Sequence, residues 1–462
     1  MAYYGIYSPA FLLHFVAVIA VNYLFAVQIQ RTRSKTLVGM AVAANILHLA
    51  FFKYFNSVFA LVAPQGAALP EWFKIVMPLA ISFYTFQFIA FLVDVYRSNA
   101  ADAPPGAAIK PEPGRYFLFM LFFPHLISGP ILRAADFYRQ IGQEVALRDM
   151  QVRGLYLVAL GLIKKLFIAD VLGYLVNPVY KNPSEYGSAD ALAAILGYTA
   201  QLYCDFSGYS DIAIGAAKIM GIDVMENFKR PLFAKNLADI WTRWHISLST
   251  WLTDYVFFYL GAYKASSKRV IFNVIFVLAV CGLWHGANWP MVLAFTMVGV
   301  FMAIRYWWQA NVLRVIKPSN SYKLFEKFFP SWMHSVVTVA IFVFCFLLFR
   351  VHTAQMVINF THPTEKVSWV AMAKAIYGNL FKLHTAGYFY GWMTHQGIVQ
   401  FIIVLFFMTV LILTEAIIGD VKIETVALAK TKTTRWTIYI LLLVCIVWFG
   451  IFNNTSFVYF QY

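Results

Sequence analysis

The strongest constraint in this sequence is a series of apolar segments, each about as long as a membrane is thick. They include residues 11–27, 37–62, 155–176, 333–349 and 398–418, and roughly 20 apolar residues suffice for a helix to cross a hydrocarbon core. Only 12% of the chain is charged and its mean hydropathy is +0.68, whereas about 25% of a soluble domain is charged. We therefore expect a polytopic membrane protein with 11 or 12 transmembrane helices.

The segments between these spans carry most of the positive charge. The formal net charge is +15. Basic loops stay on the cytoplasmic side of a membrane, so the cluster Arg31, Arg33 and Lys35 predicts an N-terminus that faces outward, and residues 422–435 form a second cytoplasmic loop. Orientation explains most of the charge, and a secondary role in holding a coenzyme A phosphate stays open. Nucleic-acid binding is not indicated, because the basic residues do not gather in one solvated domain.

The cysteines and the first apolar segment give no sign of a disulfide framework or a cleaved leader. All four cysteines lie in apolar surroundings without a C-x-x-C pair, which is typical of packing residues rather than of a disulfide or a zinc site: Cys204, Cys281, Cys345 and Cys445. The first apolar segment lacks a basic leader and a small-residue cleavage site, so we expect a retained span.

Two regions do not fit an uninterrupted span. In FPHLISGPILR (residues 123–133), Pro124 and Pro130 interrupt the apolar run, and proline breaks a helix. Broken backbone at membrane depth is tolerated where it is buried in protein or lines a cavity, so this segment is a candidate cavity wall. Residues 224–266 are less apolar and basic at both ends, and we expect them to form re-entrant or interfacial helices.

Polar and ionisable residues concentrate between residues 203 and 289. His245 and His285 lie 40 residues apart in this stretch, and each follows a tryptophan. Ionisable residues at or near membrane depth are costly and are therefore candidates for function. Four motifs contain the polar residues: CDFSGYSDIAIG (204–215), ENFKRP (226–231), WTRWHISLSTWLTDY (241–255) and GLWHGANW (282–289).

These four motifs resemble the membrane-bound O-acyltransferase family, in particular its bacterial branch that O-acetylates polysaccharides. The proteins that attach D-alanine to teichoic acid are near relatives of that branch. PLAISFYTFQ (residues 78–87) is a further match, and the resemblance covers most of the chain. It implies the all-α, multi-pass fold of the family in a single integral-membrane domain over residues 1–462, with the family core at 78–313.

The resemblance places His285 at the catalytic histidine position of the family. A neutral imidazole can take the proton from an acceptor hydroxyl as that hydroxyl attacks a thioester. Gly282 and Gly286 leave room beside it for substrate or for another helix. The alternative is a buried histidine that only satisfies a neighbour. Whether His285 acts as a base or briefly carries the acyl group stays open.

His245 is the second catalytic residue that the resemblance implies. On a helix, Trp241 and His245 would share a face because they are four residues apart, while Arg243 would point elsewhere. His245 either orients the acceptor, stabilises the developing oxyanion, or holds the core through hydrogen bonds. Arg243 either meets donor phosphates or pairs with Asp239 or Asp205.

The expected substrate-binding residues come from the same stretch. Asp205 and Asp211 are expected to orient or charge-pair histidines and arginines, because the run GYSDI lacks the second glycine of a nucleophile elbow. No H-x-x-x-H or H-E-x-x-H pattern supports a metal, so we expect no metal and no bound cofactor. For the basic pair 229–230, contact with lipid headgroups is an equal alternative. The full set is Trp241, Arg243, Asn236, Asp205, Trp284, Asn288, Lys229 and Arg230.

The resemblance also implies a reaction and a location. Acetyl-CoA would arrive from the cytoplasm, and the acetyl group would pass to an extracytoplasmic partner protein or directly to an exported polysaccharide. The protein would lie in a bacterial cytoplasmic (inner) membrane. One alternative is D-alanyl transfer from an acyl-carrier thioester to teichoic acid.

A second alternative is a transporter or flippase of an anionic or lipid-linked solute. Broken helices and intramembrane charges suit transport. However, the sequence contains no detectable repeat, and its polar cluster centres on histidine rather than on paired carboxylates.

Overall fold

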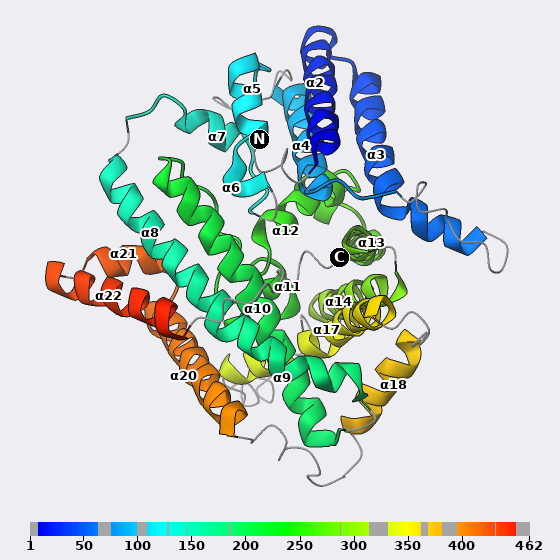
Figure 1. Ribbon diagram of the computed structural model, residues 1–462. Helices are drawn as coiled ribbons and strands as arrows, with labels where there is room; N and C mark the ends of the chain where they lie inside the picture. The colour runs from blue at the N-terminus through cyan, green and yellow to red at the C-terminus, as the bar shows by residue number, and fades with distance from the viewer. Residues whose placement is uncertain are drawn as a thin grey trace. The chain divides into compact units, whose positions relative to one another are not determined.

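Most of the residues that the computed structural model describes are helical (Figure 1). Within the described ranges, the extended contact is one isolated bridge between Phe228 and Trp244. The prediction of an all-α protein is therefore confirmed. The described residues are 8–62, 75–98, 109–126, 129–144, 146–183, 186–286, 288–313, 331–361, 368–380, 395–429 and 431–449.

The chain divides into two compact units. The first comprises Met1–Gln151 and Ala216–Met225, and the second Val152–Gly215 and Glu226–Tyr462. That residues 1–462 form a single integral-membrane domain stays a prediction. Each unit is described below by itself.

Among its described residues, the first unit contains three long helices and three short ones. The side chains of Asn22 and Asn45 exchange hydrogen bonds of 3.3 and 2.7 Å between the first two long helices, which is a common way of joining apolar helices in a membrane. Residues 113–140 are divided into short helices rather than forming one long helix, as Pro124 and Pro130 predict. Residues 127 and 128 lie outside the described part. The helices are α2 (Pro9–Thr32), α3 (Lys35–Val62), α4 (Ile81–Ser98), α5 (Pro113–Met120), α6 (Phe123–Leu126) and α7 (Ala134–Gln140).

The second unit is built on a close crossing between α8 (Leu147–Ile163) and α10 (Ser188–Ile219). A Cβ atom at Gly161 would lie 2.4 Å from the carbonyl oxygen of Gly208, and one at Gly208 would lie 2.7 Å from that of Gly161. The backbones can meet at this distance only because both residues are glycine.

Two buried lysines join the same helices. A π-helical turn, η2 (Lys164–Ala169), leads from α8 into α9 (Asp170–Lys181). Nζ of Lys164 lies 2.7 Å from the carboxylate of Asp211, and Nζ of Lys165 lies 2.7 Å from Asp205 and 2.8 Å from Asp170. The partners found for Asp205 and Asp211 are thus lysines, where the sequence indicated histidines and arginines. Lysine reaches them because the π-turn brings two consecutive lysines onto the side of the helix that faces α10.

Short helices and then a helical hairpin follow along the chain. Residues 224–266 form one-turn and two-turn helices, in agreement with the predicted non-spanning segment. After them, α13 packs against α14, and α14 packs against α17. The elements are η4 (Pro231–Phe233), α11 (Leu237–Trp241), α12 (Ile246–Leu252), η5 (Thr253–Phe257), η6 (Ala262–Lys264), α13 (Ser267–His285), α14 (Trp289–Trp308), η7 (Gln309–Leu313), α17 (Ser331–Thr361), α18 (Trp369–Leu380), α20 (His395–Ile418), α21 (Ile423–Leu428) and α22 (Lys432–Phe449).

Five stretches of the described helices are long and apolar enough to cross a membrane. They are Pro9–Thr32, Lys35–Phe59, Ser267–His285, Trp289–Val312 and Trp332–Val351, and Ile402–Ile418 is a shorter apolar helix. These helices confirm a polytopic membrane protein. The total of 11 or 12 spans stays a prediction.

Candidate active site

The motif GLWHGANW forms the end of α13, a turn and the start of α14. A Cβ atom at Gly282 would lie 2.7 Å from the carbonyl oxygen of Met291, so glycine lets the two helices touch one turn before His285. The side chain of Asn288 accepts a hydrogen bond of 3.0 Å from the backbone N–H of Met291 and caps α14, a usual role for asparagine at this position. The local sequence therefore fixes His285 at the last residue of α13.

Aromatic rings hold the imidazole of His285. The ring stacks on Phe295 of α14, with centroids 4.7 Å apart and an interplanar angle of 12°. Trp284 and Phe349 meet it edge-on, at 4.7 and 5.8 Å. Only 6% of His285 is exposed. Three helices, α13, α14 and α17, thus determine the orientation of this ring.

His245 lies at the start of α12 with an unusual backbone conformation. Its φ and ψ angles are +48° and +52°, the left-handed region that few residues other than glycine adopt and that recurs at functional sites. The helix of Trp241, α11, ends at that residue, and a new helix, α12, begins directly after His245. The expectation that these two residues share one helix is therefore wrong.

Asn227 holds the imidazole of His245 in one tautomer. Its Oδ1 accepts hydrogen bonds from the backbone N–H of Ser247 (3.1 Å) and from the Ser247 hydroxyl (2.9 Å), and it lies 3.3 Å from Nδ1 of His245. Since Oδ1 is an acceptor only, the proton of a neutral His245 lies on Nδ1 and the lone pair on Nε2. The amide of Asn227 donates in turn to Ser210 Oγ (3.2 Å).

Burial keeps His245 uncharged. The residue is 4% exposed and lies outside the five candidate spans. Desolvation lowers its pKa to about 3, because the charged imidazolium is disfavoured away from water. At neutral pH His245 is therefore a neutral hydrogen-bonding group.

The sequence interpretation omitted Asn227 from the site, although it stands in ENFKRP beside the basic pair.

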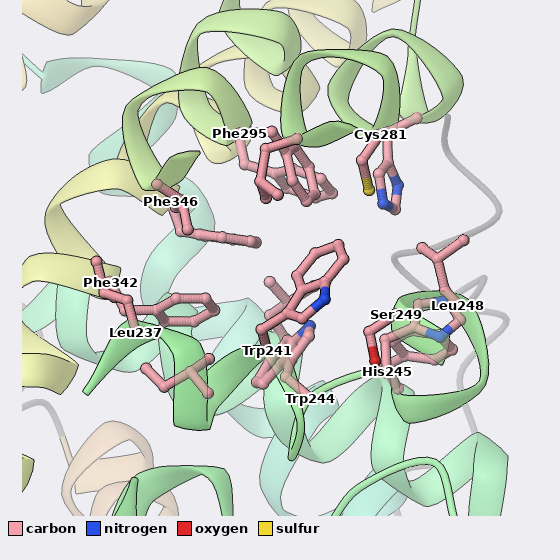
Figure 2. A pocket seen from close by; sticks show the side chains of 17 residues that line it. Leu237, Trp241, Trp244, His245, Leu248, Ser249, Cys281, Phe295, Phe342 and Phe346 are labelled. Atoms are coloured by element: carbon pink, nitrogen blue, oxygen red, sulfur yellow. The ribbon is translucent and has the colours of Figure 1, made fainter. Parts of the chain in front are cut away.

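Both histidines line one apolar pocket in the second unit. Figure 2 shows Cys281 and Phe295 on one wall, with Trp244 and His245 on the facing wall. The indole of Trp241 projects between the two walls (Figure 2). A pocket of this kind, mostly apolar with a few polar groups, is typical of a small-molecule site. The aromatic lining from α14 and α17 was not predicted, because a phenylalanine inside a span has no local signature.

Seven of the ten predicted site residues do not line this pocket. Asn236 and Asn288 act as helix caps, since Asn236 accepts a hydrogen bond of 2.9 Å from the backbone of Asp239. Asp205 lies in the buried ion pair with Lys165. Trp284 supports His285 from the side.

The remaining three, Lys229, Arg230 and Arg243, gather at a different place. Each has a nitrogen 3.7 to 3.9 Å from Oδ1 of Asp420, which lies between α20 and α21. Arg243 also pairs with Asp239 at 2.6 Å, one of the two partners expected for it. The structure thus separates the predicted residues into a histidine pocket and a basic cluster.

No group of three or more His, Cys, Asp or Glu side chains that could hold a metal ion occurs in the described part of the chain. The side chains with polar groups that line the pocket are the two histidines, Ser249, the tryptophans Trp241 and Trp244 with their indole N–H groups, and Cys281. The chemistry that these residues can supply is proton transfer and hydrogen bonding to a substrate.

The family model described as "MBOAT, membrane-bound O-acyltransferase family" matches residues 103–317. This range contains both histidines, Asn227 and the three residues of the basic cluster, whereas Asp420 lies outside it. The matched range also includes the pocket residues of α10 to α14, while those of α17 lie outside it.

Three curated proteins show the range of the relatives. The chain is 33% identical to the probable alginate O-acetylase AlgI of Pseudomonas aeruginosa, over 77% of this chain and 66% of that protein. It is 32% identical to the peptidoglycan O-acetyltransferase of Helicobacter pylori, over 65% and 62%. It is 30% identical to the teichoic acid D-alanyltransferase of Bacillus subtilis, over 53% and 62%. The chain therefore spans 62 to 66% of the length of these relatives.

Proposed function

This chain belongs to the membrane-bound O-acyltransferase family, and from that premise we propose that it transfers an acyl group from a thioester to a hydroxyl. The observation that carries this proposal is the shared pocket of His245 and His285, which come from segments 40 residues apart. Two imidazoles in one largely apolar pocket can handle a proton where water is scarce.

In this proposal His285 is the general base. It takes the proton of the acceptor hydroxyl while the hydroxyl oxygen attacks the thioester carbonyl carbon. The new C–O bond forms, the carbonyl oxygen becomes an oxyanion, and the C–S bond then breaks. His285 returns the proton to the departing sulfur, so the products are an ester and a free thiol. The stack on Phe295 keeps the ring in one orientation for both proton transfers.

His245 orients the acceptor. Its Nδ1 proton is directed to Asn227, so the lone pair is on Nε2, which can accept a hydrogen bond from the acceptor hydroxyl. Because the low pKa keeps the ring neutral, His245 does not compete with His285 for the transferred proton. Holding two substrates in a reactive geometry contributes several powers of ten to a rate.

The relatives support acetyl transfer to an exported polysaccharide. The curated names at 32 and 33% identity are a peptidoglycan O-acetyltransferase and an alginate O-acetylase, and a D-alanyltransferase follows at 30%. We therefore infer acetyl-CoA in the cytoplasm as donor and a polysaccharide outside as acceptor, with an extracytoplasmic partner protein between them. The location is a bacterial cytoplasmic membrane.

Thioester turnover tests this function. The purified chain in lipid nanodiscs is given acetyl-CoA labelled in the acetyl group, together with a soluble oligosaccharide that supplies the acceptor hydroxyl. Release of free coenzyme A is followed for the parent, His285→Ala and His245→Ala. We expect release by the parent and a loss of about 100-fold or more in His285→Ala, the scale of general-base catalysis. Equal release by the parent and His285→Ala would refute the catalytic assignment.

A second donor distinguishes the branches of the family. If D-alanyl carrier thioester is consumed and acetyl-CoA is not, the acetyl assignment is wrong and the acyltransferase assignment remains. If a labelled anionic solute crosses a sealed vesicle without thioester cleavage, the chain is a transporter and the proposal fails.

A further inference from the structure

One carboxylate oxygen lies among three cations on the second unit. Oδ1 of Asp420 is 3.9 Å from Nζ of Lys229, 3.7 Å from Nη1 of Arg230 and 3.7 Å from Nη1 of Arg243. Charge-assisted N–H···O bonds are about 2.7 to 2.9 Å long. The three cations, which we name the anion cradle, therefore enclose a space wider than a single carboxylate oxygen fills.

The other carboxylate at the anion cradle is held quite differently. Asp239 lies 2.6 Å from Nε of Arg243 and accepts a hydrogen bond of 2.9 Å from the backbone of Lys235. Among the described residues, the ion pairs of Asp420 are the long ones of 3.7 to 3.9 Å, and its side chain is 58% exposed. The weakly held carboxylate is thus the one that an incoming anion can replace.

The cradle is preformed by its own backbone. Arg230 has a left-handed φ of +50°, and its guanidinium lies 4.8 Å from the ring centroid of Phe233. Nε of Arg230 is buried and finds no acceptor among the described residues. The backbone N–H of Lys229 donates to the carbonyl of Arg243 at 2.9 Å, which ties two of the cations together. Such a site presents hydrogen-bond donors that are already in position to bind an anion.

The cradle adjoins the histidine pocket through two aromatic residues. Phe228 and Trp244 form the isolated bridge, and their rings pack edge-to-face at 5.1 Å. Trp244 lines the pocket, while the neighbouring residues Lys229 and Arg243 belong to the cradle. A donor whose thioester lies in the pocket and whose phosphate lies outside it would meet both sites.

We propose that the anion cradle binds the phosphate of the acyl donor, and that Asp420 is a built-in counter-anion that this phosphate displaces. The inference rests on the proposed function for the donor, a phosphopantetheine thioester. Phosphate is larger than one carboxylate oxygen and carries more acceptor oxygens, so it can contact both arginines and the lysine at once. A lipid headgroup phosphate shares this chemistry, and the experiment separates the two.

Binding measured by calorimetry tests the cradle without any acyl transfer. The full chain in phosphatidylcholine nanodiscs is titrated with coenzyme A and with pantetheine, which lacks phosphate. We expect Asp420→Asn to tighten coenzyme A about three- to tenfold, the scale of several weak exposed ion pairs, and Arg230→Gln to weaken it. Pantetheine binding should not change. Misfolding cannot produce the gain of affinity, so Asp420→Asn is the decisive variant.

A matched control and a second membrane complete the test. Asp136 is also 58% exposed and paired with one arginine, and Asp136→Asn should leave coenzyme A binding unchanged. The titration is repeated in discs that contain phosphatidylglycerol. If the cradle binds lipid headgroups, the headgroup phosphate occupies it, and Asp420→Asn no longer tightens coenzyme A. If the cradle binds the soluble donor, Asp420→Asn still tightens coenzyme A. Unchanged coenzyme A binding in Asp420→Asn, or an equal gain for pantetheine, overturns the cradle.

The two proposals can fail separately. Intact thioester turnover without phosphate-selective binding refutes the cradle alone. Phosphate-selective binding without turnover refutes the acyltransferase and leaves the cradle as a phosphate site.

Discussion

Oδ1 of Asn227 lies 3.3 Å from Nδ1 of His245, and the same oxygen also receives the two hydrogen bonds of Ser247. Those bonds identify the acceptor end of the amide, and through it the protonated nitrogen of the imidazole. In the proposed mechanism this places the lone pair of Nε2 toward the substrate. Asn227 is therefore a positioning residue whose effect passes through His245.

We expect Asn227→Ala to lower kcat about 10- to 100-fold, within the range of proton-transfer and orientation effects, with little change in KM for the donor. Ser210→Ala removes the partner at the other end of the amide and serves as the control, with a small effect on kcat. In Asn227→Asp, a carboxylate beside Nδ1 should raise the pKa of His245 and shift the acid limb of the rate profile to higher pH. A merely structural role would lower stability without moving that limb.

Burial of His245 also makes a prediction about stability and pH. Its pKa is about 3 in the folded chain and about 6.5 in an unfolded one. Between these values the unfolded state binds more protons than the folded state. The contribution of neutral His245 to the free energy of unfolding is therefore fully present above pH 6.5 and is lost as the pH drops toward 3. The loss is at most about 1.4 kcal/mol per pH unit, or about 2 kcal/mol between pH 6.5 and 5.

Thermal unfolding in detergent, followed by tryptophan fluorescence, checks this expectation. The parent should lose more stability between pH 6.5 and 5 than His245→Gln does, because the variant has no imidazole to protonate. Parallel pH profiles for the two proteins would show that His245 is not buried in its neutral form.

At the scale of elements, the crossing of α8 and α10 is the least tolerant contact. A Cβ at Gly208 would lie 2.7 Å from a backbone oxygen, and a backbone atom cannot turn aside as a side chain can. We expect Gly208→Ala to lower the free energy of unfolding by about 1 to 3 kcal/mol, the usual cost of overpacking. Thermal unfolding in detergent measures the change.

Gly378 is the matched control, since it lies inside α18 and a Cβ there would meet nothing within 4 Å. Gly378→Ala should be neutral or stabilising by up to about 1 kcal/mol, because alanine is the better helix former. Equal destabilisation by both substitutions would argue against a close crossing at Gly208.

At the scale of the whole molecule, the sequence predicted what depends on local pattern. Apolar segments predicted helices, and the tryptophan-histidine motifs predicted both imidazoles of the pocket. Asn288 was predicted to bind substrate but caps α14. Its position directly before Trp289-Pro290 is a helix-start signal that favours a cap. The local pattern thus contained the correct interpretation.

Other features depend on contacts between distant segments. Phe295 and Phe349 frame His285 from α14 and α17, and Asp420 reaches Arg230 from 190 residues away. A span rich in phenylalanine does not reveal which ring will face a histidine, and a loop aspartate does not reveal its partner. Only packing determines these pairs.

Orientation in the membrane connects these contacts with donor access. Basic segments between spans stay in the cytoplasm, and the basic residues between 422 and 435 lie beside α21 and in the first turn of α22, shortly after Asp420. The cradle that contacts Asp420 then faces the cytoplasm as well. From Ser188 to Ser210, α10 rises about 33 Å, about the thickness of the hydrocarbon core. Since Ser210 contacts Asn227, Asn182 before the start of α10 should lie on the outer side.

Single-cysteine labelling with a membrane-impermeant maleimide decides the orientation, because Asn182 and Thr434 are both exposed. We expect Asn182→Cys to react in intact spheroplasts and Thr434→Cys to react only after lysis. The parent is the control, since three of its four cysteines are buried and the fourth is half-buried. The reverse pattern would place the anion cradle outside the cell. Cytoplasmic acetyl-CoA could not then reach it, and the donor assignment would fail together with the orientation.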